Sequence, residues 1–343
     1  MRILQVIAGA DQGGAETFFV SLVLALQRAG LDQQVVMRHN PGRAAPLRAA
    51  GLEPVECRFG QWFDWHTKAT LKRAVADFRP DIALTWMNRA SKYMPAGNFL
   101  KLARLGGYYD LKYYRACDHL FCNTKGIVAH VVNHGWPAAR AHYMPNFASI
   151  EPAPPVPRDG LDTPADAPLL LAMGRLHRAK AFDTLLRALA SEPRAYLWLA
   201  GEGPLRDELE ALAHELGVMP RVRFLGWRDD RAALIGAADI CLVPSRYEPL
   251  GNVCLEAWAA GRPLVAAASA GPSELITDGA DGLLVPIDDA AALAQAITRV
   301  IDGPGLPERL VAGGARRYEE GFSETACVKR YLDTFKRLLQ ARV

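Results

Sequence analysis

The sequence of 343 residues lacks several features that would assign it to a class at once. Its six cysteines form no CxxC pair and have no clustered histidines, which argues against a zinc site or a disulfide framework, so we expect reduced, mostly buried thiols. No apolar run is long enough to span a bilayer. The first residues, MRILQVIAG, start a strand pattern without a charged leader or a cleavage site, so we expect a cytoplasmic protein.

The composition that remains is typical of a soluble globular protein. Apolar residues make up 50% of the chain and charged residues 22%, and the length suffices for two domains with separate cores. Basic residues outnumber acidic ones by 19 to 13 in residues 1–165, whereas residues 166–343 hold 21 basic and 24 acidic ones. We therefore expect the first half to face an anionic partner.

In the first half, short apolar segments alternate with helical patterns, which predicts a parallel, doubly wound sheet. The segment GADQGGAETFF leads from the first strand into a helix that reaches about Gly30. Gly13 and Gly14 leave room for a ligand close to the backbone, and Glu16 lies in the first helical turn. The predicted strands are 3–8, 34–38, 54–58, 81–86, 119–123 and 142–145.

Residues 92–115 mix cations with aromatic side chains and contain one acid, Asp110. The mixture suits the surface of an anionic membrane, or a solvated helix whose tyrosines turn into the core. Single-strand nucleic-acid grooves have a similar composition, but no DNA- or RNA-binding motif accompanies it, so nucleic acid is not an expected partner. The residues are Lys92, Lys101, Arg104, Lys112 and Arg115, with Tyr93, Phe99, Leu100, Tyr108, Tyr109, Tyr113 and Tyr114.

Residues 151–168 contain six prolines and almost no apolar periodicity, which predicts a stiff linker. Beyond it the alternation of strands and helices resumes more clearly. The predicted strands are 169–173, 196–200, 222–225, 240–243, 264–267 and 283–285, with helices from about Ala181, Pro204, Asp230, Gly251, Ala290 and Pro307 and a last one over 324–339.

The stretch 244–265, PSRYEPLGNVCLEAWAAGRPLV, places one helix between two buried strands. Glu248 precedes the helix, Glu256 lies one to two turns inside it, Gly251 stands between them, and Asn252 can cap the helix. A helix start attracts phosphate, and a carboxylate accepts hydrogen bonds from vicinal diols. The arrangement fits a nucleotide sugar; two solvated glutamates beside an ordinary helix are the alternative.

A second motif, GRLHRAKAFDTLLRAL, begins at Gly174 directly after a predicted strand. Arg175 and Lys180 can clamp a diphosphate, because a guanidinium binds phosphate in a bidentate manner and an ammonium is a mobile point charge. Two unrelated surface cations on a loop are the alternative.

These segments resemble the family 4 retaining glycosyltransferases. EPLGNVCLE, followed by AWAAGRPLV and AGPSELITDGADGLLVP, is similar to the family signature of two glutamates separated by seven residues, and GRLHRAK, GEGP at 201–204 and FLGW at 224–227 share the family's order and spacing. The resemblance covers nearly the whole chain, most specifically 169–290.

The resemblance implies an α/β architecture, the GT-B fold. Two Rossmann-like doubly wound parallel-sheet domains then face a cleft, and a C-terminal helix crosses back to the first domain. The implied division is an acceptor domain over 1–150, a proline-rich linker over 151–168, a nucleotide-sugar donor domain over 169–320, and the helix over 321–343.

The resemblance also implies residue roles. Arg175 and Lys180 bind the diphosphate and stabilise it as it leaves, while Glu248 holds sugar hydroxyls and Glu256 ribose hydroxyls. The anomeric configuration is retained and the leaving phosphate accepts the acceptor's proton, so no metal, cofactor or enzymic nucleophile is expected. We expect the Trp227 ring to pack rather than to stack on the base. The expected donor-binding set is Gly13, Gly14, Gly174, Arg175, Lys180, Gly226, Trp227, Glu248, Pro249, Leu250, Gly251, Asn252 and Glu256.

One segment departs from the family. Many members carry a His-Gly pair near the transferred sugar, where this sequence reads ARLGGYYD, and Gly106 and Gly107 cannot replace an imidazole. Glu16, Asp110 and His119 are the candidates for the acceptor side, although His119 at a strand start also fits a structural role.

The sequence therefore predicts a metal-independent, retaining hexosyltransferase that takes a nucleoside-diphosphate sugar, with a UDP-sugar favoured. The expected acceptor is a glycolipid or polysaccharide precursor of lipopolysaccharide or exopolysaccharide synthesis, with peripheral binding to the inner membrane face as a further hypothesis. An epimerase of the same fold would need an acid and a base that the sequence does not identify. A sugar-binding protein would be exported, and a nicotinamide oxidoreductase would need the G-x-G-x-x-G fingerprint that is absent.

Overall fold

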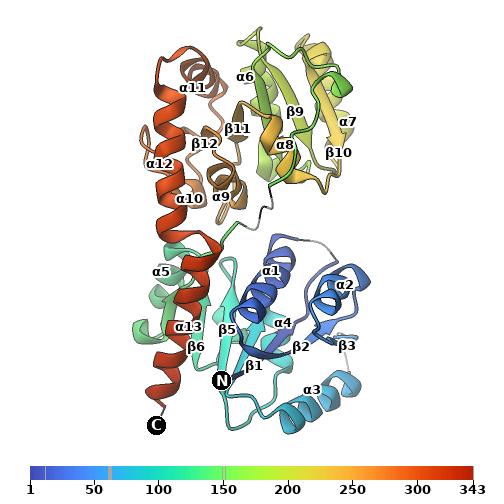
Figure 1. The fold of residues 1–343 in the computed structure, drawn as a ribbon, viewed down its shortest axis with the longest axis vertical. Helices are drawn as coiled ribbons and strands as arrows, with labels where there is room; N and C mark the ends of the chain where they lie inside the picture. Colours follow the sequence, from blue (N-terminus) through green and yellow to red (C-terminus); the bar gives the residue numbers. More distant parts are fainter. Residues whose placement is uncertain (12, 61–63, 149, 151, 343) are drawn as a thin grey trace. The chain divides into compact units, whose positions relative to one another are not determined.

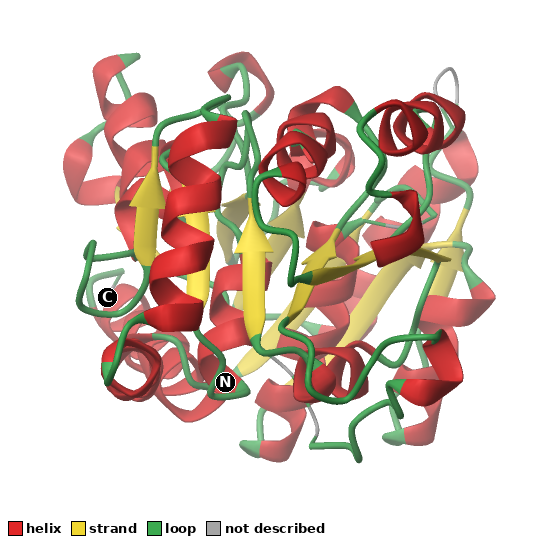
Figure 2. Ribbon diagram, turned by 90° about the horizontal axis from the view of Figure 1, so that it is seen from above, coloured by secondary structure: helices red, strands yellow, loops and turns green. Residues whose placement is uncertain are grey.

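The computed structural model describes residues 1–11, 13–60, 64–148, 150 and 152–342. The chain divides into two units (Figure 1), the first formed by Met1–Asn146 with Glu324–Val343 and the second by Phe147–Ser323. Each unit is an α/β body around a parallel sheet, with helices around its strands (Figure 2). The prediction of two Rossmann-like parallel-sheet domains is confirmed.

The first unit contains a seven-stranded sheet in the order β3-β2-β1-β4-β5-β6-β7. Its central strands β1 and β4 are mostly apolar, and all their residues except Arg2 are buried, as expected for parallel strands covered on both faces. The strands are β1 (Arg2–Ile7), β2 (Asp32–Arg38), β3 (Val55–Cys57), β4 (Ile82–Trp86), β5 (Leu100–Leu105), β6 (His119–Cys122) and β7 (Ala141–Tyr143). The helices are α1 (Gly14–Arg28), α2 (Pro41–Ala49), α3 (Trp65–Phe78), α4 (Met87–Tyr93), α5 (Lys125–Asn133) and α13 (Glu324–Gln340), with short 3-10 turns η1 (Leu111–Tyr113) and η2 (Ala138–Arg140).

Strand β5 contradicts the alternative that residues 92–115 form one solvated helix, and it removes two cations from the surface that could face a membrane. All six of its residues are buried, including Lys101 and Arg104. The Arg104 guanidinium lies 4.8 Å from the centre of the Phe18 ring and 5.1 Å from that of Trp86, and it donates to Asn146 Oδ1. Cations packed on aromatic rings tolerate burial better than isolated ones. Lys101 Nζ donates instead to the Met94 carbonyl at 3.0 Å. Because both charges are buried, they are unavailable to a membrane.

The C-terminal helix α13 packs on the first unit. Its Phe335 ring stacks on Phe121 of β6 with 5.8 Å between ring centres, Tyr331 is fully buried, and Cys327 Sγ lies 3.7 Å from the Asn146 carbonyl oxygen. Aromatic packing of this kind buries enough apolar surface to fix a helix whose outer face is charged.

The second unit contains a six-stranded sheet in the order β10-β9-β8-β11-β12-β13. The strands are β8 (Leu169–Met173), β9 (Tyr196–Ala200), β10 (Val222–Gly226), β11 (Ile240–Val243), β12 (Leu264–Ala267) and β13 (Leu283–Val285). The helices are α6 (Phe182–Ala190), α7 (Arg206–Glu215), α8 (Arg231–Ala237), α9 (Asn252–Ala259), α10 (Ala270–Leu275), α11 (Ala290–Asp302) and α12 (Leu306–Gly321), with 3-10 turns η3 (Asp159–Leu161), η4 (Arg178–Lys180) and η5 (Met219–Arg221).

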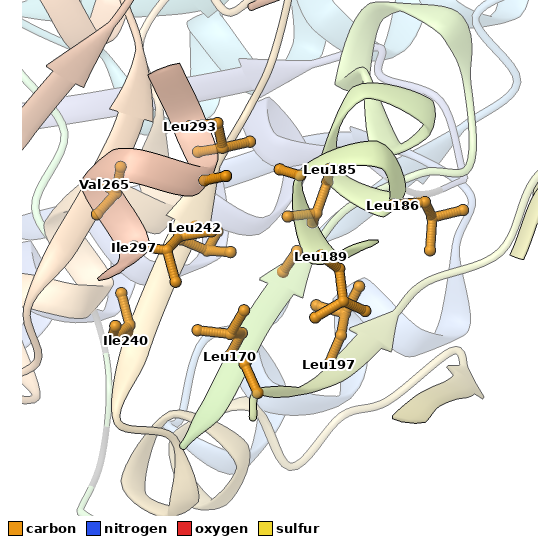
Figure 3. Close-up of a cluster of buried hydrophobic side chains, with 14 of the residues drawn as sticks. Leu170, Leu185, Leu186, Leu189, Leu197, Ile240, Leu242, Val265, Leu293 and Ile297 are labelled. Carbon is orange, nitrogen blue, oxygen red and sulfur yellow. The ribbon is translucent and has the colours of Figure 1, made fainter. Parts of the chain in front are cut away.

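Alternate residues of β8 supply the two cores of this unit, because successive strand side chains point to opposite faces. Leu170 joins the cluster formed with α6 and α11, which Figure 3 shows around Leu185, Leu189 and Ile297. Leu169 and Leu171 join the opposite cluster with α8 and α9. Helices therefore cover both faces, which leaves the ends of the strands as the place for a ligand.

The proline-rich segment was expected to be a stiff linker. In the structure, residues 152–168 are anchored to the second unit. The Val156 N–H donates to the Ala233 carbonyl at 3.1 Å, Arg158 Nη2 reaches Asp239 Oδ1 at 2.9 Å, and Trp198 Nε1 donates to Thr163 Oγ1 at 2.9 Å. Periodicity could not predict these contacts, since they join irregular backbone to distant elements.

Candidate functional site

The two motifs singled out in the sequence come together at the switch point of the second sheet. From β8 the chain proceeds outward through β9 to β10, and then returns to place β11 on the other side of β8. The loops that follow β8 and β11 carry Arg175, Lys180 and Glu248. A reversal of strand order opens a crevice at the carboxyl ends of parallel strands, which is where such sheets bind ligands.

Lys180 and Glu248 form an ion pair across this switch point. Lys180 Nζ donates to Glu248 Oε2, and Ser245 Oγ lies 3.4 Å from the same oxygen. The side chains are 25% and 14% exposed, so the pair is screened from water on most sides and still open to a ligand. A charge pair in such a position can exchange its internal contact for contacts to a bound anion and to hydroxyl groups.

Arg246 holds the two loops together and was not singled out in the sequence. Its guanidinium makes two hydrogen bonds to Asp183, at 2.9 and 2.7 Å, reaches Asp288 Oδ1 at 2.5 Å and donates to the Arg178 carbonyl at 2.9 Å. Burial raises the pKa of Asp183, but the hydrogen bonds from Arg246 outweigh it and the pKa is lowered overall.

A backbone hydrogen bond completes the connection between the two loops. The Tyr247 N–H donates to the Ala179 carbonyl at 3.2 Å. Together with the Arg246 contacts, it fixes the loop before Glu248 on the turn that carries Lys180. An arginine two residues before a glutamate is a weak sequence signal, because only the fold brings Asp183 and Asp288 to it.

Glycines allow the loops after β8, β9 and β10 to pack directly on one another. Gly201 adopts φ 145°, and a Cβ there would lie 1.9 Å from the Gly174 carbonyl oxygen. A Cβ on Gly203 would lie 2.4 Å from the Leu176 carbonyl oxygen. The loops are joined by hydrogen bonds from Leu176 N to the Glu202 carbonyl, 2.9 Å, and from Gly201 N to the Gly226 carbonyl, 2.7 Å.

This packing leaves Arg175 at the outer end of its loop. Its side chain is exposed and makes no hydrogen bond or ion pair with any residue that the structure describes. A guanidinium held on a rigid loop without a partner is available to an anionic ligand.

The structure does not show the expected packing of the Trp227 side chain, because the residue is 55% exposed. Its indole Nε1 donates to Asp229 Oδ1 at 2.9 Å, and its backbone N–H lies 3.4 Å from Glu202 Oε1. Gly226 adopts φ 67°, which turns the chain so that Trp227 points outward. Glu202, the acidic residue of GEGP, is thus a neighbour of this loop that the sequence analysis did not assign.

Helix α9 begins differently from the prediction that Asn252 caps it. Gly251, at φ 91°, occupies the N-cap position without a side-chain cap, and Asn252 is the first helical residue. Gly271 packs against the segment before the helix, because a Cβ there would lie 2.3 Å from the Leu250 carbonyl oxygen. Pro249 is half-buried and Leu250 buried, so they support this turn.

Glu256 lies inside α9 with its side chain 10% exposed. Arg231, the first residue of α8, donates from Nη2 to Glu256 Oε2. Burial raises the pKa of Glu256, and the Arg231 charge opposes this rise without cancelling it. The sequence predicted Glu256 as a site residue but gave no sign of its partner.

The candidate residues of the first unit have identifiable local contacts. Glu16 is buried, and its Oε1 accepts from the Ala10 N–H at 2.8 Å. A Cβ on Gly13 would lie 2.3 Å from Glu16 Oε2, so this glycine makes room for the carboxylate, and Gly14 begins α1.

Two further candidates also have local partners. Asp110 accepts from the Lys112 N–H at 2.9 Å and pairs with the Lys112 ammonium at 2.7 Å. His119 Nδ1 lies 3.1 Å from His142 Nε2, within a half-buried pair.

Two general features complete the description of the site and its surroundings. In the described part of the chain, all six cysteines are buried and none forms a disulfide, and no group of three or more histidine, cysteine or acidic residues is placed to hold a metal ion. None of the described helices combines the length and apolarity required to cross a bilayer.

Comparison with known proteins identifies relatives of the whole chain. Residues 167–303 match the family model described as Glycosyl transferases group 1. The chain is 40% identical over 343 residues to lipopolysaccharide core biosynthesis glycosyltransferase LpsD of Rhizobium meliloti, covering 98% of each protein, and 39% identical over 336 residues to LpsE of the same organism, covering 97% and 98%. Among solved structures, HepE of Anabaena in complex with UDP has a TM-score of 0.86 at 20% identity, over 98% of this chain and 100% of that one, which establishes the common fold.

Proposed function

The chain belongs to the group 1 glycosyltransferases, and from this membership and the site at the β8/β11 switch point we propose that it transfers a hexose to a lipopolysaccharide core precursor. The proposed donor is a nucleoside-diphosphate sugar, with a UDP-sugar favoured because HepE, a protein of the same fold, binds UDP. The observation that carries the proposal is the Lys180–Glu248 pair beside the unpartnered Arg175.

In this proposal the second unit is the donor domain. Arg175 and Lys180 bind the diphosphate together with the backbone at Gly251 and Asn252, because two cations and a helix start all favour anionic oxygens. Glu248 then leaves Lys180 and accepts hydrogen bonds from hydroxyls of the sugar, while Glu256 accepts from the ribose. Gly174, Gly226, Trp227, Pro249 and Leu250 shape the backbone and the base side of the donor pocket.

The mechanism follows from where charge develops. Breaking the anomeric bond places positive charge on the sugar and additional negative charge on the nucleoside diphosphate. Arg175 and Lys180 act on that negative charge, so they stabilise the transition state more than the ground state. The acceptor's hydroxyl proton passes to the leaving phosphate oxygen on the same face of the sugar, the anomeric configuration is retained, and no metal takes part.

The first unit is the acceptor domain in this proposal. Gly13, Gly14 and Glu16 form a tight turn after β1 that shapes the acceptor site, with Asp110 and His119 as further acceptor-side residues. Because Lys101 and Arg104 are buried, membrane binding would rest on the remaining exposed set around η1. These residues are Lys92, Lys112 and Arg115 with Tyr108 and Tyr113, and the proposed location is the cytoplasmic face of the membrane.

A ligand screen tests the proposed function. The purified protein is heated with UDP, GDP, ADP, CMP, NAD or free sugars, with and without EDTA. We expect one nucleoside diphosphate to raise the melting temperature in EDTA, and its sugar conjugate to be hydrolysed slowly or transferred to a core acceptor. Stabilisation by NAD alone or by a free sugar alone would contradict the proposal.

A further inference from the structure

Arg231 and Glu256 form a pair that the roles given so far do not explain. They come from different helices, α8 and α9, and are 25 positions apart. The carboxylate is buried, whereas the Arg231 side chain is 41% exposed. Replacing a buried ion pair by apolar residues is often neutral or stabilising, so its presence beside a ligand site suggests a role in binding.

Only one oxygen of the Glu256 carboxylate accepts a hydrogen bond from the described residues. Oε2 is engaged by Arg231, whereas Oε1 receives no hydrogen bond from any group that the structure describes, and it is not among the fully enclosed unpaired atoms. The other titratable groups that act on Glu256 or are acted on by it are Cys241 and Cys254, whose buried thiols have raised pKa values and are neutral. Arg231 is therefore the cation that compensates this carboxylate.

Glu256 lies about one turn inside the helix whose start binds the diphosphate in the proposed function. A helix rises about 1.5 Å per residue, so Glu256 lies about 6 Å from Asn252 along the α9 axis. The proposed function assigns the ribose hydroxyls to this carboxylate and the diphosphate to the backbone at Gly251 and Asn252.

We propose that Arg231 is a positioning residue that fixes the Glu256 carboxylate through Oε2 and thereby directs Oε1 to the ribose hydroxyls of the donor. The inference rests on the proposed function. A buried carboxyl without its cation would favour the protonated form, which rotates and donates instead of serving only as an acceptor. Arg231 acts through Glu256 and need not touch the nucleotide.

The experiment compares nucleotides that differ only in the ribose. Binding of UDP and GDP, and of their 2′-deoxy counterparts, is measured by calorimetry on the full chain with wild type, Arg231→Met, Arg231→Lys and Glu256→Gln. We expect Arg231→Met to weaken binding of the ribonucleotide roughly tenfold or more and to leave the affinity for the 2′-deoxynucleotide unchanged. Only the ribonucleotide has the 2′-hydroxyl that donates to the Glu256 carboxylate. Arg231→Lys should restore part of the difference.

Three controls make the result decisive. Arg206→Met removes a partly exposed Arg–Glu pair of α7 in the same unit and should leave the ribose preference intact. In the Glu256→Gln background, Arg231→Met should add no further loss of preference. The Arg231→Met variant should also bind UDP or GDP more tightly as pH rises from 5.5 to 8.5, whereas wild type should vary less.

Two outcomes are distinguished. Equal losses for ribose and deoxyribose nucleotides, in Arg231→Met or, if that variant does not fold, in Arg231→Lys, would overturn the positioning role. Failure of the wild type to bind any nucleoside diphosphate would instead contradict the proposed function itself.

Discussion

Lys180 and Glu248 neutralise each other in the structure, with the ammonium against Oε2 of a carboxylate that is only 14% exposed. The two residues are 68 positions apart and belong to loops on either side of the sheet's switch point. A ligand that separates them must replace both contacts, so the proposed function implies that binding of the diphosphate and binding of the sugar hydroxyls are coupled at this pair.

Removing either member of this pair should nearly abolish transfer. We expect Lys180→Ala or Glu248→Ala to lower kcat/KM by roughly 10³-fold, because each loses a contact to the developing charge or to the sugar and leaves its partner unpaired. Circular dichroism and melting temperature should show that both variants fold. Lys329→Ala, which removes an exposed pair with Asp333 on α13, is the matched control. Activity near the wild-type level in both site variants would refute the assigned roles.

Arg246 should support activity by holding the loops that carry Lys180 and Glu248 in place. Arg246→Met removes the bidentate bonds to Asp183 and the contact to Asp288, so the Lys180 and Glu248 loops can separate. We expect kcat to fall by roughly 10- to 100-fold and the melting temperature to drop by a few degrees. Arg246→Lys should not restore activity, because an ammonium cannot form the two parallel bonds. The surface variant Arg48→Met should behave as wild type, and an equally active Arg246→Met would contradict the argument.

Gly201 should tolerate no side chain. In Gly201→Ala, the Cβ would meet the Gly174 carbonyl oxygen at 1.9 Å, at a backbone φ of 145° that alanine avoids. We expect a loss of about 2–4 kcal/mol in the free energy of unfolding, together with weaker donor binding, because the Arg175 loop must shift. Gly321→Ala, in helix α12 with open space around its Cβ, should be neutral or slightly stabilising. Denaturant titration of both variants provides the comparison.

The histidine pair of the first unit should make stability depend on pH. Burial, His119 and Arg337 lower the pKa of His142 to about 4, and burial with Arg140 and Arg337 lowers that of His119 despite Asp118. As the pH is lowered through 6.5, the two imidazoles become protonated in the unfolded chain but stay neutral in the folded state. The free energy of unfolding should therefore fall as the pH is lowered from 6.5 to about 4. Below that, the contribution of His142 stops growing.

The effect is measured as the melting temperature across this range. His142→Asn should flatten the decline, whereas His214→Asn, at an exposed position of α7, should leave its slope nearly unchanged. A decline of equal slope in wild type and His142→Asn would exclude the histidine pair as its source.

Local patterns in the sequence predicted most strands and helices of both units. The apolar segments 169–173 and 240–243 became β8 and β11 with the same bounds. Strand β5 was missed because LKLARL carries Lys101 and Arg104, and the burial of Arg104 depends on Phe18, Trp86 and Asn146 from other elements. The hydrophobic pattern of a short segment does not show that aromatic rings far away in the sequence stabilise a buried cation.

The sequence by itself determined the architecture and the presence of Arg175, Lys180, Glu248 and Glu256, because strand periodicity and motif spacing are local properties of the chain. Tertiary structure alone decided that Lys180 meets Glu248, that Arg246 joins Asp183 across 63 positions, and that Arg231 compensates Glu256. Strand order sets these pairings, and it results from packing of the whole sheet. The chemistry of each residue was therefore readable in the sequence, whereas its partner was not.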